Sequence, residues 1–213
     1  MSGRSKLTDA FAKQVLRASL RASRKLAVLR ARGTPVRIYR DSIEKHAIDG
    51  IVVASNSRFC VVQWISGELR LDGWEIIRTC DISRVEESKN RSRFYRKILT
   101  LRGEKVSRPR NMDLEDWPAI LTWLGSRFPL LVVHQEFTHP NECQVGQVTS
   151  VSEITLTMRT VGLYGGWLSW PFRCRVRTIT RVDFGGGYEG ALALVNGARP
   201  KSAPVKKTRH ART

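Results

Sequence analysis

Lysine and arginine side chains crowd the two ends of this 213-residue chain, and their chemistry is the easiest to name. Residues 1–40 hold 11 of them against one acid, Asp9, and residues 199–213 hold six and no acid. The whole chain carries a formal net charge of +18, so residues 41–198 account for only +2. Dense terminal cations of this kind are suited to neutralising the phosphates of a nucleic acid.

Ten of these cations are the candidate nucleic-acid-binding residues. They are Lys13, Arg17, Arg21, Arg24, Lys25, Arg32, Lys206, Lys207, Arg209 and Arg212. The first six lie on an expected amphipathic helix over residues 8–32, which Gly33 and Pro35 would end. Such a helix can also be a solvated face with no ligand, a membrane-surface helix, a helix for a partner's groove or an organellar targeting segment.

Motifs for nucleotide binding and for metal binding are only partly matched along the chain. The run from Gly185 to Gly190 matches GxGxxG, but no βαβ unit can follow it before the basic tail, so we interpret it as a bend into a helix. His134, His139 and Cys143 lie close in sequence without the spacing of a zinc site. We therefore expect no enzyme, no catalytic residue, no metal and no cofactor.

The four cysteines indicate a reducing compartment. They are widely spaced and form no CxxC pair, so we expect reduced thiols rather than a disulfide framework. No apolar run approaches the roughly 18–20 residues that a membrane-spanning helix needs. These two observations together predict a cytoplasmic location without a transmembrane segment.

The middle of the chain contains an internal repeat. Gly50 begins a pair of strand-like runs joined by a short polar gap, and Gly146 begins another. The first half then reaches Asp81-Ile-Ser-Arg-Val-Glu86, and the second reaches Thr178-Ile-Thr-Arg-Val-Asp183. Because the two motifs recur in the same order at similar spacing, we interpret them as a duplication.

The repeat predicts five segments along the chain. These are a basic helical arm over 1–35, a first repeat with a trailing helix over 36–103, a linker with a short helix over 104–129, a second repeat over 130–197 and a disordered basic tail over 198–213. We expect the trailing helix to run from about Ser88 to Leu101, with Phe94, Ile98 and Leu101 on one side.

The body resembles small bacterial proteins of unassigned function that carry two tandem Sm-like or SH3-like barrels. The resemblance covers about 36–197 and rests on Leu71-Asp-Gly-Trp74, on Asp81-Ile-Ser-Arg-Val-Glu86 and on the second copy that ends in Asp183-Phe-Gly. It implies a mainly β fold with added helices (α+β) and two tandem small barrels. The residues that hold RNA in Sm rings are not matched here, so that pocket is not carried over.

We therefore expect a non-enzymatic nucleic-acid-binding protein, with RNA preferred, that uses its basic arms on phosphates with little sequence specificity. The alternative is a protein-interaction adaptor that binds a partner, or a second copy of itself, through the edges of the paired barrels. Aromatic residues such as Trp167 and Phe172 can stack on unpaired bases, although core packing is the ordinary role of such residues.

Overall fold

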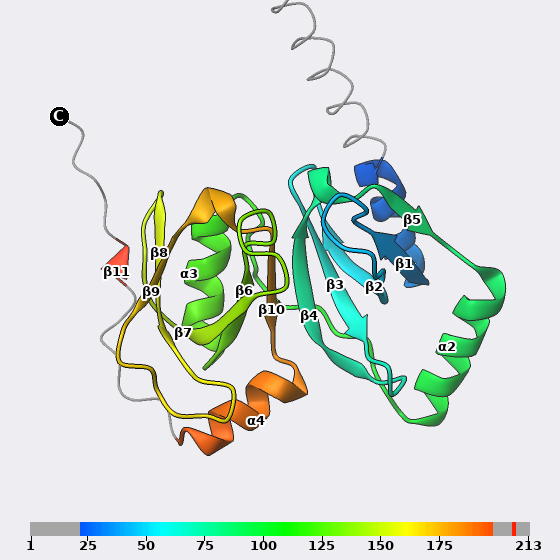
Figure 1. Ribbon diagram of the computed structural model, residues 1–213. Coiled ribbons are helices and arrows are strands. Elements are labelled where there is room, and N and C mark those ends of the chain that lie inside the picture. The colour runs from blue at the N-terminus through cyan, green and yellow to red at the C-terminus, as the bar shows by residue number, and fades with distance from the viewer. Residues whose placement is uncertain (1–21, 198–205, 208–213) are drawn as a thin grey trace, which may run out of the picture. The chain divides into compact units, whose positions relative to one another are not determined.

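The computed structural model describes residues 22–197 and the backbone of 206–207, and within them the chain divides into two compact units (Figure 1). The first unit comprises residues 22–71 and 77–108, and the second comprises residues 72–76 and 109–197. The boundary near residue 108 lies inside the segment expected to be a linker, because residues 104–108 belong to the first unit and the following helix belongs to the second.

The first unit contains five strands between two helices, except that residues 72–76, within the fourth strand, belong to the second unit. Residues 22–32 form the first helix. The other elements are β1 (Pro35–Tyr39), β2 (Ile48–Ser55), β3 (Phe59–Ile65), β4 (Leu71–Arg78), the 3-10 helix η1 (Thr79–Asp81), β5 (Arg84–Glu86) and α2 (Lys89–Leu101). The strands are ordered β5-β1-β2-β3-β4. Leu26 and Leu29 are buried in the core of this unit, so the helix presents the apolar face that its sequence predicts.

The second unit repeats this plan. Its elements are α3 (Trp117–Arg127), β6 (Leu131–His134), β7 (Cys143–Val151), β8 (Thr155–Thr160), β9 (Phe172–Arg175), η2 (Val176–Thr178), β10 (Arg181–Phe184) and α4 (Gly187–Val195). The strands are ordered β10-β6-β7-β8-β9, which is the order of the first unit again. A two-residue strand, β11 (Lys206–Lys207), runs parallel to β7 beside Ser150 and Val151.

The two repeats bend at equivalent glycines. Gly50 of β2 pairs with Trp64 of β3, and Gly146 of β7 pairs with Thr160 of β8. A Cβ atom would lie 2.6 Å from the carbonyl oxygen of Gln63 at the first position, and a Cβ at Gly146 would meet a carbonyl oxygen at 2.4 Å. The register shifts within four residues after each glycine. Both positions therefore require glycine so that the strands can bend closely past each other.

The hairpin turns after these strands also match. In the first unit the Asn56 side chain accepts hydrogen bonds from the backbone N–H groups of Arg58 and Phe59. In the second unit the Ser152 hydroxyl accepts from the N–H groups of Ile154 and Thr155. Each turn is thus held by a short polar side chain at its start, which is the usual role of Asn and Ser in turns.

The fold is mainly β with added helices, as expected. The described strands follow one open path, β5-β1-β2-β3-β4-β10-β6-β7-β8-β9, with β5 and β9 at its two ends. The strand pairing therefore does not establish two closed barrels. No helix in the described part of the chain is long and apolar enough to cross a membrane.

Helix α2 does not pack through the side that Phe94 and Leu101 share. Ser92 and Leu99 are the buried residues of α2, whereas Phe94 is 52% exposed and Leu101 is 73% exposed. The Ser92 hydroxyl donates to the carbonyl oxygen of Pro35 at 2.9 Å, and this bond fixes the rotation of the helix. The side that carries Phe94 and Leu101 therefore faces away from the core of this unit.

Candidate nucleic-acid interface

Only some of the predicted phosphate ligands lie within the described residues. Lys13, Arg17, Arg21, Arg209 and Arg212 lie outside them. For Lys206 and Lys207 the structure gives the backbone of β11 alone. Arg24, Lys25 and Arg32 lie on the first helix and are exposed.

Two of these three helix cations have partners within the first unit. The Lys25 ammonium donates to the carbonyl oxygen of Val85 in β5. The Arg32 guanidinium lies 3.6 Å from the Glu87 carboxylate, although its side chain is 61% exposed. Arg24 makes no ion pair or hydrogen bond through its side chain to any other described residue, so it is the freest of the three to meet a phosphate.

A second basic segment lies on and after α2, and it is denser than the first helix. Residues 89–108 hold eight Lys and Arg side chains and one acid, Glu104, a net charge of +7. They are Lys89, Arg91, Arg93, Arg96, Lys97, Arg102, Lys105 and Arg108. Helix α2 itself has no acidic residue, so nothing along it offsets the charge of its five cations.

Three of these eight cations are held by the fold. Arg96 donates to the Thr34 hydroxyl at 2.8 Å, and Arg102 donates to the carbonyl oxygen of Leu69 at 3.0 Å. The Arg91 guanidinium lies 3.9 Å from the Asp49 carboxylate. These contacts anchor α2 beside the start of β1 and leave Arg96, Arg102 and Arg91 less free to bind a ligand.

The other five cations are exposed and have no partner among the described residues. They are Lys89, Arg93, Lys97, Lys105 and Arg108. Lys89, Arg93 and Lys97 follow one another at intervals of four residues, so they form a stripe along α2 with successive steps of about 6 Å. This stripe, together with Lys105 and Arg108 that follow it in the chain, is the candidate nucleic-acid interface, called the α2 surface below.

The charge of the two units has opposite sign. The described part of the first unit holds 19 Lys and Arg side chains against 8 acids, a net charge of +11. The described part of the second unit holds 7 against 10, a net charge of −3. The near-neutral total over residues 41–198 hides this difference, because it averages a basic segment with acidic surroundings. A net charge taken in windows of about 20 residues finds the α2 surface from the sequence.

Other cations of the first unit serve the fold. Arg37 of β1 lies opposite Asp49 of β2 and makes two bonds to its carboxylate, at 3.0 and 2.8 Å. This pairing raises the pKa of Arg37 further above its ordinary value, chiefly through the hydrogen bond to Asp49. Arg40 is fully buried and pairs with Glu44. Neither guanidinium is available to a phosphate.

The glycine-rich run of the second unit leads into helix α4, and a carboxylate already binds the N-terminal end of that helix. Gly185 has a φ of +69°, and Gly186 caps α4. The N–H of Gly187 donates to the Asp72 carboxylate at 2.6 Å. Because a carboxylate of the same unit takes the place where a phosphate would bind, this run does not act as a nucleotide loop.

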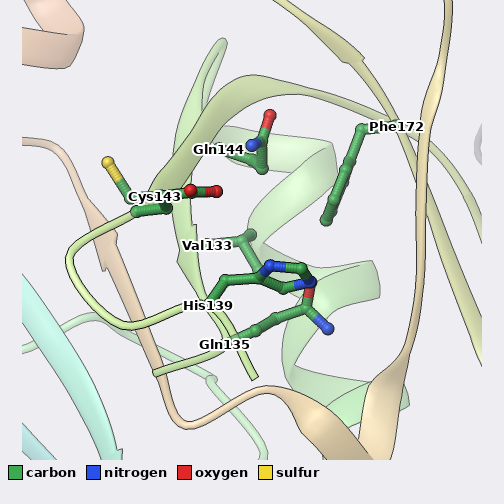
Figure 2. Close-up of a pocket in the computed structure, with 7 residues that line it drawn as sticks. Val133, Gln135, His139, Cys143, Gln144 and Phe172 are labelled. Carbon is green, nitrogen blue, oxygen red and sulfur yellow. The ribbon is translucent and has the colours of Figure 1, made fainter. Parts of the chain in front are cut away.

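The second unit contains a small hollow of about 100 Å³ at the start of β7 (Figure 2). It is lined by Val133, Gln135, His139, Glu142, Cys143, Gln144 and Phe172. Figure 2 shows the Cys143 sulfur directed away from Phe172 and from the His139 ring, so thiol and imidazole do not converge on one point. Burial is the main cause of a raised pKa at Cys143, which opposes formation of a thiolate.

Among the described residues, no group of three or more His, Cys, Asp or Glu side chains is arranged to hold a metal ion. His134 instead pairs with Asp183 at 2.9 Å, and the Arg181 guanidinium approaches it at 3.1 Å. His134 therefore serves the packing of β6 against β10, apart from His139 and Cys143.

The predicted aromatic residues divide between core and surface. Trp117 is buried and donates its ring N–H to the carbonyl oxygen of Ile179 at 3.1 Å. Trp167 packs on a core cluster of the second unit, with the Arg159 guanidinium 4.7 Å from its ring centre. Trp170 is 84% exposed. On the first unit, Phe94 is an exposed aromatic ring next to the cations of α2.

Comparison with known proteins gives no relative from which a function could be transferred: no protein-family model, curated protein or solved structure matches the chain.

Proposed function

We propose that this protein is a non-enzymatic nucleic-acid-binding protein, with RNA preferred, and that the α2 surface of the first unit is its main phosphate-binding face. The observation that best supports this proposal is the set of five exposed cations on and after α2 that have no partner among the described residues. They belong to a unit whose described part has a net charge of +11. Phosphate contacts of this kind give affinity with little sequence preference. The cations of the terminal arms add to the same attraction.

We further propose that each unit is a small Sm-like or SH3-like barrel. Support comes from the shared strand order, from a 3-10 helix before the last strand of each repeat and from the bends at Gly50 and Gly146. The barrel would be only partly closed, because the described strand pairs leave the path open. A fold of this kind does not by itself determine function, so the binding proposal rests on the charged surface.

The proposal also places the protein in the cytoplasm. All four cysteines are free, with Cys60 and Cys174 buried and Cys80 and Cys143 exposed, which suits a reducing compartment.

The test is nucleic-acid binding by the full chain across a salt series, read by fluorescence anisotropy of a labelled 20-nucleotide RNA and its DNA counterpart. We expect the double variant Arg93→Gln/Lys97→Gln to weaken binding. The slope of log K against log salt should become shallower by about 1.4 for the two lost contacts on a single strand. The matched control is Arg173→Gln/Arg175→Gln, which removes the same charge from exposed positions of the second unit.

If Arg93→Gln/Lys97→Gln bound nucleic acid with the affinity and salt slope of the wild type, the α2 surface would not be the phosphate-binding face. Absence of salt-dependent binding by the wild type would overturn the function itself. Deleting residues 1–32 is a poorer test, because Leu26 and Leu29 would leave the core together with the cations. Charge substitutions keep that core intact.

A second candidate function, a protein-interaction adaptor, is favoured by an exposed apolar surface on the second unit. Its members are Leu163, Tyr164, Leu168, Trp170, Leu194 and Val195. The loop that holds the first four is tied to the end of α4, where the N–H of Gly166 donates to the Asn196 side chain at 2.8 Å. Contiguous exposed apolar side chains of this number are typical of protein-binding sites.

The partner that this second surface suits is an apolar, acidic protein segment. Arg173 and Arg175 are exposed on β9, which ends the strand path of the unit. Self-association by antiparallel pairing of two β9 strands would bring these arginines together, which opposes it. Peptides selected from a random display library should be acidic and apolar and should lose binding to Trp170→Ala but not to Arg93→Gln/Lys97→Gln. If the selected peptides bound Trp170→Ala as tightly as Arg93→Gln/Lys97→Gln, the exposed apolar surface of the second unit would not be their binding site.

A further inference from the structure

We infer that the α2 surface binds single-stranded nucleic acid, with an unstacked base lying on the ring of Phe94. This inference rests on the proposed function and specifies the form of nucleic acid that the same surface takes. Three features carry it: the exposure of Phe94, the position of the cations around it and the absence of acids along the helix.

Phe94 is exposed although the rest of α2 is well anchored. The helix buries Ser92 and Leu99, and Tyr95 packs against the cluster of Ile51, Ile65 and Leu99. Phe94 remains 52% exposed, with its ring centre 5.9 Å from that of Tyr95. Because these neighbours fix the rotation of the helix, the exposed face of the ring is a lasting feature of the surface.

The free cations lie next to this ring. Arg93 precedes Phe94 in the chain, and Lys97 lies about one turn further along the helix, roughly 60° around its axis from Phe94. Neither has a partner among the described residues. A base that stacked on Phe94 would therefore have its own phosphates within reach of a guanidinium and an ammonium group, as on single-strand-binding surfaces that combine aromatic rings with cations.

This arrangement favours a single strand over a duplex. In a duplex the bases stack on each other and present only their edges in the grooves, so their faces are out of reach of a phenyl ring. An unpaired base offers a whole face. The same surface suits a protein groove less well, because α2 exposes one other large apolar side chain, Leu101, and no acid to pair with basic partners.

The experiment separates stacking from charge by measuring affinity and salt slope together. The probes are fluorescein-labelled 12-nucleotide oligouridine, 12-nucleotide oligothymidine and a 12-base-pair RNA duplex, each titrated with the full chain. We expect Phe94→Ala to weaken binding to the single strands roughly 5- to 140-fold, which is the usual range for one stacked base. The salt slope should stay unchanged, because no phosphate contact is lost.

Conservative variants and a matched control distinguish stacking from general apolar contact. Phe94→Trp should keep the affinity, whereas Phe94→Leu should lose it as Phe94→Ala does. Leu101→Ala removes an exposed apolar side chain from the same helix and should leave binding to oligouridine within about twofold of the wild type. Circular dichroism and thermal melting of each variant confirm that α2 is still formed.

The inference is overturned if Phe94→Leu binds oligouridine as the wild type does, or if the duplex binds as tightly as the single strands. It is also overturned if Phe94→Ala impairs only the binding of vesicles of phosphatidylglycerol and phosphatidylcholine. In each of these cases a reduced salt slope in Arg93→Gln/Lys97→Gln would still support nucleic-acid binding. If the wild type itself showed no salt-dependent binding, the proposed function would be overturned. The two failures are therefore distinguishable.

Discussion

The guanidinium carbon of Arg84 lies 3.8 Å from the centre of the Tyr39 ring, and the hydroxyl of the same ring donates to Glu86 at 2.9 Å. Arg84 and Glu86 both belong to β5, and Tyr39 lies at the end of β1. One aromatic side chain therefore receives a cation on its face and an anion at its edge. This contact fastens the last strand of the first repeat to its first strand.

The second repeat builds the same arrangement from other residues. His134 ends β6, Arg181 and Asp183 lie on β10, and His134 pairs with Asp183 at 2.9 Å while Arg181 approaches the ring at 3.1 Å. The hydroxyls of Ser83 and Thr180 donate to the carbonyl oxygens of Tyr39 and His134, both at 3.1 Å. The two repeats thus share a way of joining first and last strands, with tyrosine in one and histidine in the other.

Removing the Tyr39 hydroxyl tests this junction. We expect Tyr39→Phe to lower the free energy of unfolding by about 1 kcal/mol, because the hydrogen bond to Glu86 is lost while the ring stays beneath Arg84. Urea denaturation measures the change. In a double-mutant cycle with Glu86→Gln, the two effects should not add, and strict additivity would show that the hydroxyl and the carboxylate do not interact.

The bend at Gly146 predicts an effect of steric origin. A Cβ there would lie 2.4 Å from the carbonyl oxygen of Arg159, so we expect Gly146→Ala to cost about 1–3 kcal/mol of stability. Gly190 is the control, because a Cβ at that position of α4 meets nothing within 4 Å. Gly190→Ala should stabilise the protein by about 0.5–1 kcal/mol through the better helix propensity of alanine. Equal effects in thermal melting would contradict this account.

Glu189 predicts a pH effect. Its carboxyl group is buried in α4, and burial, with smaller contributions from Asp183 and Asp72, raises the pKa of Glu189 above its ordinary value. A raised pKa means that the folded state holds the proton more tightly than the unfolded state. Stability from this group is present at pH below the unfolded pKa and falls as the pH rises through the folded pKa.

We therefore expect Glu189→Gln to raise the melting temperature at pH 7 and to have little or no such benefit at pH 4, where the wild-type carboxyl is largely protonated. Differential scanning calorimetry at the two pH values measures the change. Glu153→Gln, at an exposed turn of the same unit, is the control and should change little at either pH. A stabilisation by Glu189→Gln that is larger at pH 4 would contradict the assigned cause.

The cysteines predict a pattern of chemical reactivity. Burial raises the pKa of Cys60 to about 12 and that of Cys174 to about 11, so neither forms an appreciable thiolate at pH 8. Cys80 and Cys143 are exposed. Burial also raises the pKa of Cys80 and of Cys143, so we expect a thiol reagent to modify these two slowly, but faster than Cys60 and Cys174, in the folded protein. All four cysteines should react in guanidinium chloride. Peptide mass spectrometry that finds rapid labelling of Cys60 in the folded state would contradict the burial described.

Much of the fold could be predicted from the sequence because its signals are local. Alternating or apolar runs predict each hairpin. Asn56 and Ser152 hold the turns through hydrogen bonds to residues two and three positions away. The predicted trailing helix, from about Ser88 to Leu101, agrees with α2 (Lys89–Leu101) to within one residue. The pairing of Tyr39 with Glu86 could not be predicted from such local signals, because the two residues lie 47 positions apart and Tyr39 belongs to no motif.

The candidate site was harder to predict for two physical reasons. The net charge of a long segment averages out a dense local cluster, so the cations after Lys89 were hidden by the acids around them. The packing face of α2 was ambiguous, because Phe94 and Leu101 form one apolar stripe and Tyr95 and Leu99 form another. The bond from Ser92 to Pro35 decides between them, and that contact depends on the tertiary fold.

The assignment of residues 72–76 to the second unit makes that unit discontinuous in sequence. A fragment beginning at Pro109 would lack the Asp72 carboxylate that accepts from Gly187, leaving the first turn of α4 without that cap. A fragment ending at Arg108 would carry residues 72–76 away from the partners that they contact. Neither fragment would therefore contain one whole unit and nothing else, and we expect the chain to tolerate a break near residue 108 poorly.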